Sequence, residues 1–421
     1  MRNERDAFRI RFVTETNVID VRHGQTHDRA MKIHSVLPWL CVLLTTPAEA
    51  APFDRDAWMA DYGRLKVALA QSYANMDWQI EQRRLNLVGA DAFITGMLER
   101  ADSDAAATLA MVKLVDAFRD PHLQLAAGPP PEDTAITPAQ ASEGSPEATS
   151  DVCTAEGYAP AKPATRLPYP QAPGWKQLGE GPFLAGVIGN IGVLRIPEFS
   201  ESRYLDACHA VARRGLEGRE LQLAARAELN RQLRAKVAAL KAAGMKRLVI
   251  DLSRNGGGSE WSTEAAALFA NARLSRNTPR LAGPTCDRSA IWKGEKPACS
   301  IYRGDLTTEF ADRPDTPIWS GPLAVLVDRQ TASAAEEFAT WMQDNGQARI
   351  GGEKTFGAGC GYIDGGNIFT FRAAPMHLTM PNCSRIRRDG TNEIEAVTPD
   401  VAIDWRTLQP PDVAKAFDRL F

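Results

Sequence analysis

The sequence has almost no excess of charge of either sign, with 49 lysines and arginines against 52 aspartates and glutamates in 421 residues. A dedicated nucleic-acid-binding protein usually carries a clear basic excess, so this balance argues against that class. The apolar run at residues 36–44 is far shorter than the roughly 20 residues that span a bilayer, so no stable membrane span is predicted. The 44% share of hydrophobic residues is nevertheless enough to build a sizeable core.

The common sequence patterns for metal and nucleotide binding are also missing. No two cysteines form a Cys-x-x-Cys pair, which makes a metal site a weak alternative to disulfide bonds. The glycines at 256–258 are not followed by the Lys-Ser/Thr pair that a P-loop requires. We therefore expect neither a metal nor a cofactor, and we find no internal repeat.

Residues 31–50 contain the three parts of a secretory signal in the right order: a lysine near the start, the apolar run at 36–44 and a small-x-small motif that ends at Ala50. We expect translation to begin at Met31, which makes residues 1–30 an over-extended start. Cleavage after Ala50 would then release a periplasmic or secreted protein. The alternative is a short buried helix in a cytosolic protein.

The cysteine count depends on that cleavage. One of the seven cysteines leaves with the signal peptide, and the remaining even number is typical of disulfide bonds in an oxidising compartment. Six cysteines can pair in many ways, so the sequence does not fix the connectivity. Proximity along the chain suggests Cys286 with Cys299 and Cys360 with Cys383, which leaves Cys153 with Cys208.

The rest of the chain divides into three parts by composition. Residues 51–127 carry apolar side chains at three- and four-residue spacing, which predicts an N-terminal helical domain. Residues 128–181 are rich in proline, alanine, serine and threonine and are interpreted as a Pro-rich linker. Residues 182–421 alternate between strand-like and helix-like segments, which favours an α/β core.

Two strand-to-helix turns in the core could carry chemistry. In the first, three glycines at 256–258 follow a buried strand and can expose backbone N–H groups to a phosphate or a developing oxyanion, although a plain tight turn is the alternative. In the second, Ser333 is expected at the start of a helix, with the N–H of Ala334 unpaired beside it. That position suits a nucleophile, but an N-cap serine is the more common role.

Together the two turns closely resemble the tail-specific (carboxy-terminal-processing) protease superfamily, which includes tricorn protease and interphotoreceptor retinoid-binding protein. The resembling segments are 248–258, 324–359 and 397–400. The most specific one runs from Thr331 to Glu336 and continues in Gly352–Gly359. The resemblance implies an α/β fold with a ClpP/crotonase-like core, a small N-terminal helical domain and serine peptidase activity.

The resemblance also implies residue roles. Ser333 would be the nucleophile, and the amides of Ala334 and Gly257 would form the oxyanion hole. Members that use a Ser–Lys dyad have a lysine 25 positions after the serine, and this chain has Ala358 there. Lys354 lies four residues too early. The sequence is therefore expected to be closer to the non-lysine, tricorn-like branch.

That branch uses a histidine ahead of the core and a glutamate near the end of the chain. His122 matches the histidine, and it can accept the serine proton as a neutral imidazole. Glu393 matches the late glutamate, with Glu395 as the fallback. The two other histidines after Ala50 lie in a helical and a strand-like segment, where packing or surface roles are expected.

The leading prediction is a secreted serine peptidase that hydrolyses peptides or proteins through an acyl-enzyme on Ser333. The alternative is a catalytically inactive ligand- or peptide-binding protein on the same fold, because the lysine is missing. A crotonase-like acyl-CoA enzyme fits poorly with a signal peptide. We recognise no peptide-binding PDZ module after His122, and the oligomeric state is not predicted.

Overall fold

The computed structural model describes residues 52–130, 151–160, 167–212, 215–302, 307–312, 314–404 and 407–421. The predicted over-extended start, the predicted signal peptide and part of the predicted linker lie outside these residues. Within the described ranges, no helix is both long enough and apolar enough to cross a membrane.

The N-terminal region is helical, as its apolar spacing predicts. It contains α1 (Arg55–Ser72), α2 (Met76–Glu81), α3 (Leu87–Glu99) and α4 (Asp104–Phe118). Polar side chains cap three of these helices at their first turns, because Asp54, Asn86 and Ser103 each accept a backbone N–H there. Helix α4 ends at Phe118 and is capped by Arg119, whose left-handed backbone turns the chain towards His122.

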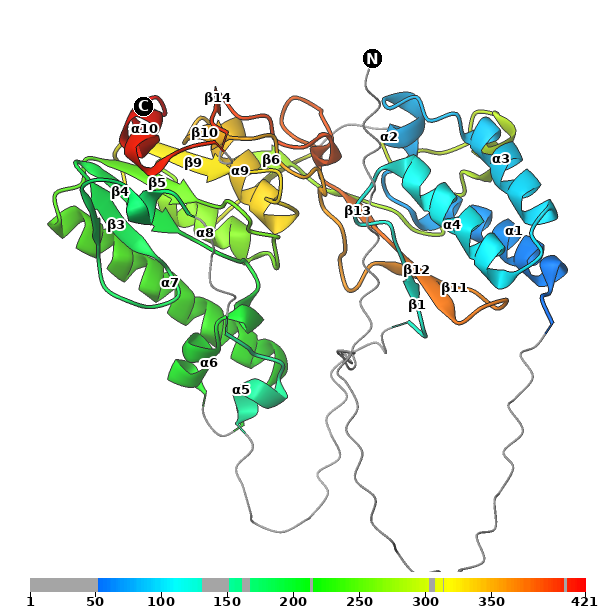
Figure 1. The fold of residues 1–421 in the computed structure, drawn as a ribbon, viewed down its shortest axis with the longest axis horizontal. Coiled ribbons are helices and arrows are strands. Elements are labelled where there is room, and N and C mark those ends of the chain that lie inside the picture. The colour runs from blue at the N-terminus through cyan, green and yellow to red at the C-terminus, as the bar shows by residue number, and fades with distance from the viewer. Residues whose placement is uncertain are drawn as a thin grey trace, which may run out of the picture. The chain divides into compact units, whose positions relative to one another are not determined.

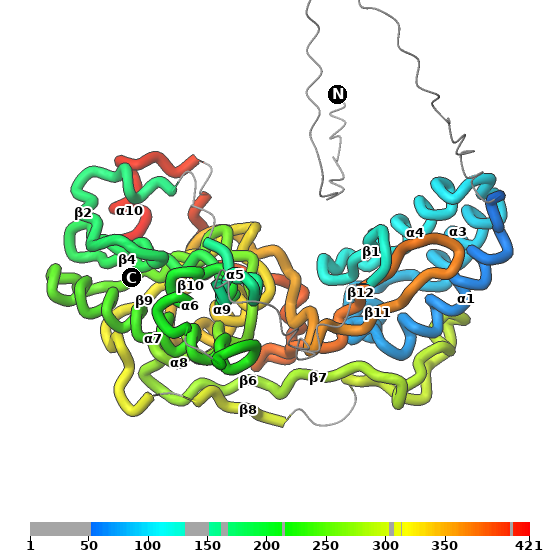
Figure 2. The backbone as a smooth tube through the Cα atoms, turned by 90° about the horizontal axis from the view of Figure 1, so that it is seen from below, coloured from blue at the N-terminus to red at the C-terminus, as the bar shows by residue number. Residues whose placement is uncertain are grey.

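A three-stranded antiparallel sheet packs against these helices (Figure 2). It consists of β1 (Gln124–Ala127), β12 (Met376–Met380) and β11 (Asn367–Thr370), in that order. Strands β11 and β12 pair antiparallel, with Phe369 opposite Leu378. Because Leu378 and Phe369 share one hydrophobic core with Trp58 of α1, distant parts of the chain build this region together.

The second region is built on a seven-stranded sheet among the described residues, in the order β14-β10-β9-β5-β4-β3-β2 (Figure 1). The five strands from β14 to β4 are parallel, and β3 and β2 continue the sheet antiparallel. Their bounds are β2 (Trp175–Gln177), β3 (Ala185–Ile188), β4 (Ile191–Arg195), β5 (Arg247–Asp251), β9 (Leu323–Val327), β10 (Arg349–Gly352) and β14 (Val401–Ala402). The predicted α/β core with a helical N-terminal region is confirmed.

Both faces of this sheet are covered, so its central strands are apolar on both sides. Leu248 and Ile250 of β5 pack into a core with α7 (Gly218–Ala242), α8 (Trp261–Phe269) and α9 (Ala334–Asp344). Val249 points to the opposite face, where α10 (Val413–Asp418) supplies Phe417. This alternation follows from the two-residue period of a strand.

Three disulfide bonds join the cysteines in the suggested pairs: Cys153–Cys208, Cys286–Cys299 and Cys360–Cys383. The remaining short elements are α5 (Val152–Ala155), η1 (Tyr169–Gln171), η2 (Glu201–Arg203), α6 (Leu205–Val211), β6 (Ser275–Asn277), β7 (Arg280–Leu281), η3 (Ser289–Lys293), β8 (Thr308–Phe310), β13 (Cys383–Ser384), η4 (Glu393–Glu395) and η5 (Pro410–Asp412). Strand β13 and η4 lie close to the candidate site described next.

Candidate active site

The two turns singled out in the sequence lie side by side. Strands β5 and β9 pair in parallel, so their carboxyl ends, and the turns that follow them, are at the same edge of the sheet. The N–H of Ala332 donates to the carbonyl oxygen of Asn255 at 3.0 Å. A Cβ atom added to Gly257 would lie 2.8 Å from both the Ser333 Cβ and the Ala334 nitrogen. Only glycine therefore allows the first turn to approach the serine this closely.

Ser333 has a strained backbone, with φ 54° and ψ −120°. An ordinary N-cap residue lies in the extended region, whereas a non-glycine residue in this region costs about 1–3 kcal/mol. The turn is held by Asp328, whose Oδ1 accepts N–H groups at 2.9 Å from Arg254 and 3.0 Å from Thr331. Such strain is typical of a serine presented as a nucleophile between a strand and a helix, and exceeds what capping requires.

The two predicted oxyanion donors differ in their present partners. The N–H of Ala334 is at the first turn of α9, and no acceptor for it is found among the described residues. The N–H of Gly257 instead donates to Oδ1 of Asn255 at 2.8 Å. Asn255 is itself held by a bond from its side-chain amide to the carbonyl of Ile196. One donor is thus available, and the other is engaged by a neighbouring side chain.

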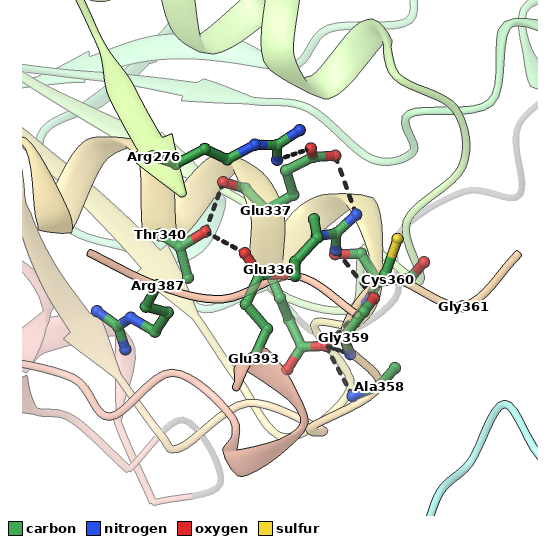
Figure 3. Close-up of polar contacts among 12 residues, drawn as sticks. Arg276, Glu336, Glu337, Thr340, Ala358, Gly359, Cys360, Gly361, Arg387 and Glu393 are labelled. Atoms are coloured by element: carbon green, nitrogen blue, oxygen red, sulfur yellow. Dashed lines mark hydrogen bonds and ion pairs between the residues drawn. The ribbon is translucent and has the colours of Figure 1, made fainter. Parts of the chain in front are cut away.

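Glu336 binds the loop at residues 357–359 (Figure 3) and also the backbone of Ser333. Its carboxylate accepts the N–H of Ser333 at 2.9 Å and that of Ala358 at 2.9 Å. Further hydrogen bonds come from Gly357, Gly359 and the Thr355 hydroxyl. Burial raises the pKa of Glu336, although these hydrogen bonds favour the ionised form. Glu336 is not among the site residues predicted from the sequence, although Ser333 and Glu336 have the Ser-x-x-Glu spacing of a capping box.

His122 lies on the short connection between α4 and β1 and contacts the same loop. Its Nδ1 is 2.7 Å from the carbonyl oxygen of Ala358. Its ring packs against Gly361, where an added Cβ would lie 2.7–2.8 Å from three ring atoms. The Tyr362 ring meets it edge-on at 5.2 Å, and the Tyr362 hydroxyl donates to the carbonyl of His122. No hydrogen bond joins His122 to Ser333 directly, but both are held by residues 357–361.

The surroundings of His122 favour a neutral imidazole. Burial lowers the pKa of His122, while Asp120 and the Ala358 carbonyl oppose that effect. A carbonyl oxygen can only accept a hydrogen bond, so the proton of the neutral ring is on Nδ1. Nε2 is then left as the proton acceptor. Asp120 also accepts the N–H of His122 at 3.0 Å, which fixes the backbone that carries the ring.

Among the described residues, no hydrogen bond or ion pair joins Glu393 to His122. Its carboxylate pairs with Nε of Arg385 at 2.5 Å and accepts the hydroxyl of Thr340 at 3.0 Å (Figure 3). Arg385 in turn donates to the carbonyl oxygens of Ser333 at 3.2 Å and Gly359 at 2.9 Å. Glu393 therefore acts on the serine turn through Arg385, a residue that the sequence analysis did not identify.

A second buried glutamate completes this ion-pair network. Although burial opposes its ionisation, Arg385 and Arg276 lower the pKa of Glu337 to about 2. Glu337 also accepts the hydroxyl of Ser262 at 2.8 Å, so α8 and α9 are joined behind the serine turn. The guanidinium of Arg385 thus faces two carboxylates, which offsets the cost of burying its charge.

The remaining residues considered from the sequence lie away from the serine turn or serve other contacts. Lys354 is exposed. Glu395 accepts the indole N–H of Trp78 at 2.8 Å and pairs with Arg83 of the helical region at 2.7 Å. His209 pairs with Asp151 at 2.7 Å on the surface. His377 is buried in β12 and contacts the carbonyl of Gly128.

One group of potential metal ligands occurs among the described residues: Asp151, Cys153 and His209. Cys153 is bonded to Cys208, so its sulfur is not a free thiolate. The group therefore lacks the sulfur donor that a transition-metal site would use.

Comparisons with known proteins show which family the chain resembles and which folds are similar to it. The sequence model of peptidase family S41 matches residues 190–403, which is half of the chain. A carboxyl-terminal-processing protease from Picosynechococcus sp. is 32% identical over 120 residues, which are 28% of this chain and 24% of that relative. The match thus spans about a quarter of the relative's length.

Two solved structures of CPAF have a similar fold. Mature CPAF has a TM-score of 0.57 at 14% identity, covering 86% of this chain and 96% of the other. CPAF complexed with lactacystin has a TM-score of 0.56 at 14% identity, covering 87% and 97%. At this identity the likeness concerns the fold alone.

Proposed function

The chain belongs to peptidase family S41, and on that premise we propose that it is a serine peptidase in which Ser333 is the nucleophile and His122 the general base. The observation that carries the proposal is the meeting of three features at one sheet edge: the strained Ser333, the glycine turn packed against it, and the loop at 357–361 that holds His122. A binding protein would not need the strain at Ser333 or an imidazole with a free Nε2.

In the proposed mechanism, Nε2 of His122 accepts the hydroxyl proton as Ser333 Oγ attacks the scissile carbonyl carbon. The resulting oxyanion is bound by the N–H of Ala334. We assign the second donor to Gly257, whose N–H an incoming oxyanion would share with Asn255. The protonated imidazole then gives its proton to the leaving amine, and water hydrolyses the acyl-enzyme by the reverse sequence.

Glu393 is assigned a positioning role, since its contact runs through Arg385 to the carbonyl of Ser333. The serine and the histidine must come within hydrogen-bond distance for proton transfer. Catalytic hydrogen bonds often tighten only when substrate binds. Residues 357–361 contact His122 directly and Ser333 through Glu336, so a movement of this loop on substrate binding would shift both residues.

We also propose that the protein acts in the periplasm or outside the cell. The three disulfides support an oxidising compartment, and they are consistent with the signal peptide predicted at residues 31–50. The expected substrate is a peptide or an unfolded protein chain. Reading the first residue of the naturally produced protein tests the cleavage site, and a start near Ala51 is expected.

The activity is tested by incubating the purified protein and its Ser333→Ala variant with denatured casein and following the fragments by mass spectrometry. Cleavage by the wild type alone is expected, together with a phosphonyl adduct on the Ser333 peptide after treatment with a fluorophosphonate, which loses fluoride as the serine oxygen attacks phosphorus. If the folded wild type neither cleaves casein nor forms the adduct, the alternative of an inactive binding protein is favoured instead.

A further inference from the structure

The loop that holds His122 is built largely from glycines. Gly357, Gly359 and Gly361 all have left-handed backbones, with φ 83°, 64° and 71°. Glycine restricts the backbone less than any other residue, so three of them within five positions give the loop little rigidity of its own. The Ala358 carbonyl that binds Nδ1 of His122 lies inside this run. The position of the proposed base therefore depends on the contacts that fix the loop from outside.

Noncovalent contacts fix the first half of the loop. Glu336 accepts the N–H groups of residues 357–359, and Arg385 donates to the carbonyl oxygen of Gly359 at 2.9 Å. Both side chains also bind the backbone of Ser333, Glu336 at its N–H and Arg385 at its carbonyl. Among the described residues, Gly359 is the last loop position that either side chain binds. The first half is thus attached to the turn that carries the nucleophile.

A disulfide bond fixes the second half of the loop. Cys360 is joined to Cys383 and stands directly before Gly361 (Figure 3). Gly361 packs so closely on the His122 ring that an added Cβ would lie 2.7–2.8 Å from three ring atoms. Cys383 is fully buried in β13, two residues before Arg385. One covalent link therefore joins the part of the loop that contacts the base to the strand that leads into Arg385.

Hydrogen bonds beyond the disulfide extend the same attachment. Asn382 accepts the N–H of Ile363 and donates to its carbonyl oxygen, both at 2.8 Å. Tyr362, which lies between Ile363 and the disulfide, donates its hydroxyl to the carbonyl of His122. His122 is thus held at its ring and at its backbone by residues that directly follow Cys360.

The other two disulfides lie elsewhere in the fold. Cys153–Cys208 joins α5 to α6, and Cys286–Cys299 encloses η3. Among the described residues, the hydrogen bonds of these four cysteines reach neither the loop at 357–361 nor the serine turn. The chain therefore contains two disulfides that can serve as controls for the one beside the candidate site.

We propose that the Cys360–Cys383 disulfide is a positioning element that sets His122 against Ser333, so that peptidase activity is high with this pair oxidised and low with it reduced. The inference rests on the proposed peptidase function and adds a covalent control to it. Without the disulfide, the bonds from Glu336 still hold the first half of the loop, whereas the half that contacts His122 loses its covalent anchor.

The redox step is an ordinary exchange with a dithiol. A thiolate of the dithiol attacks one sulfur of the pair and breaks the S–S bond, and its second thiol then closes a new disulfide within the reductant. Two electrons pass from the dithiol to the pair, and each cysteine sulfur ends as a thiol with one proton. Cys360 is only half-buried, which gives a small reductant a sulfur to approach.

The first test replaces both cysteines of each pair with alanine, one pair at a time. Alanine is chosen because serine would bury an unpaired hydroxyl at Cys383. Each variant is assayed for kcat and KM on a casein peptide that the wild type cleaves, and for its rate of fluorophosphonate labelling. Loss of the Cys360–Cys383 pair should lower kcat and the labelling rate by about tenfold to hundredfold with little change in KM, because a displaced base slows the chemical step. The other two variants should keep the wild-type kcat.

Urea midpoints separate positioning from a general loss of stability. A disulfide that closes a longer loop restricts the unfolded chain more. Removal of Cys153–Cys208, with a sequence separation of 55, should therefore lower the midpoint more than removal of Cys360–Cys383, with a separation of 23. The loss of kcat should have the opposite order. A kcat that falls in proportion to the midpoint across the three variants would overturn the positioning role.

A double-mutant cycle tests whether the disulfide acts through His122. The alanine pair at 360 and 383 is combined with His122→Gln, and the labelling rate should then fall no further than in His122→Gln alone. A merely structural role would lower the rate by the same factor with and without His122.

A reduction experiment needs no variant that must fold. The wild type is treated with dithiothreitol, and alkylation followed by mass spectrometry gives the reduced fraction of each cysteine pair. The labelling rate should fall in step with reduction of Cys360–Cys383 and recover on reoxidation. The variant with alanine at both of these positions should not respond to the reductant.

The outcomes separate this inference from the function on which it rests. Ser333-dependent labelling that is unchanged by loss or reduction of the Cys360–Cys383 pair, or that falls equally with and without His122, overturns the positioning role and leaves the peptidase proposal intact. Absence of Ser333-dependent labelling and cleavage in the wild type with all three disulfides intact contradicts the proposed function and therefore this inference as well.

Discussion

The Nδ1 atom of His122 lies 2.7 Å from the backbone carbonyl oxygen of Ala358, 236 residues further along the chain. In the Ser–Lys members of the superfamily that the sequence resembles, the lysine base is 25 positions after the serine, and Ala358 is at that position here. In this chain the backbone carbonyl of Ala358 binds His122 instead. Because the carbonyl fixes the tautomer, Nε2 is the atom that would accept the Ser333 proton in the proposed mechanism.

Replacing Gly257 with alanine should strongly reduce peptidase activity without unfolding the protein. Gly257 has φ 105°, and the added Cβ would lie 2.8 Å from the Ala334 nitrogen, where the oxyanion is expected. Gly256→Ala is the matched control, because nothing lies within 4 Å of its added Cβ. We expect a loss of kcat of at least about tenfold for Gly257→Ala, in line with the loss of an oxyanion donor. Equal activity of the two variants would contradict the placement of the oxyanion beside Gly257.

Glu336→Gln should weaken both the fold and the activity. The glutamine amide can accept on its one oxygen only, so at least one buried N–H from Ser333 or residues 357–359 loses its acceptor. Each such unsatisfied group costs about 1–3 kcal/mol. The urea midpoint should fall and kcat should fall with it, since Ser333 and the loop that holds His122 share this carboxylate. A variant with wild-type kcat and stability would show that Glu336 does not set the geometry of the serine turn.

Glu393→Gln distinguishes a positioning residue from a member of the proton relay. Glu393 pairs with Arg385, and Arg385 reaches the Ser333 carbonyl, so the substitution should lower kcat with little change in the apparent pKa of the pH–rate profile. The removal of one partner of a buried ion pair should also destabilise the fold by about 3–5 kcal/mol. A shifted acid limb in the profile of kcat/KM would instead place Glu393 in direct electrostatic contact with the base.

The local features of the site could be predicted from the sequence because they depend on a few adjacent residues. A buried strand, a turn and a polar residue at a helix start are visible together at Ser333, and three glycines mark the facing turn. Glu336 was within reach of the same reasoning, because its spacing from Ser333 is that of a capping box. Proximity along the chain also suggested two of the disulfide pairs and left Cys153 with Cys208 as the third, although the sequence alone does not fix the connectivity.

The long-range features could not be predicted in this way. The contact between His122 and Ala358 depends on how the helical region packs against the loop that precedes β11, and no periodic pattern encodes that packing. Glu393 pairs with Arg385, and no motif around Arg385 in the sequence marks it as a site residue. The domain boundaries predicted at residues 127 and 182 also do not indicate that β11 and β12, which come after residue 182, complete the core of the helical region.

The central claim, that His122 rather than a lysine activates Ser333, is tested most directly by the rate of fluorophosphonate labelling as a function of pH. The wild-type rate should fall as pH falls through the pKa of His122, which burial places below its ordinary value of 6.5, because protonation removes the acceptor. His122→Gln should lower the rate by about 10²–10⁴-fold and abolish this acid limb, whereas Lys354→Met should behave as the wild type. Loss of labelling in Lys354→Met with wild-type rates in His122→Gln would contradict the account.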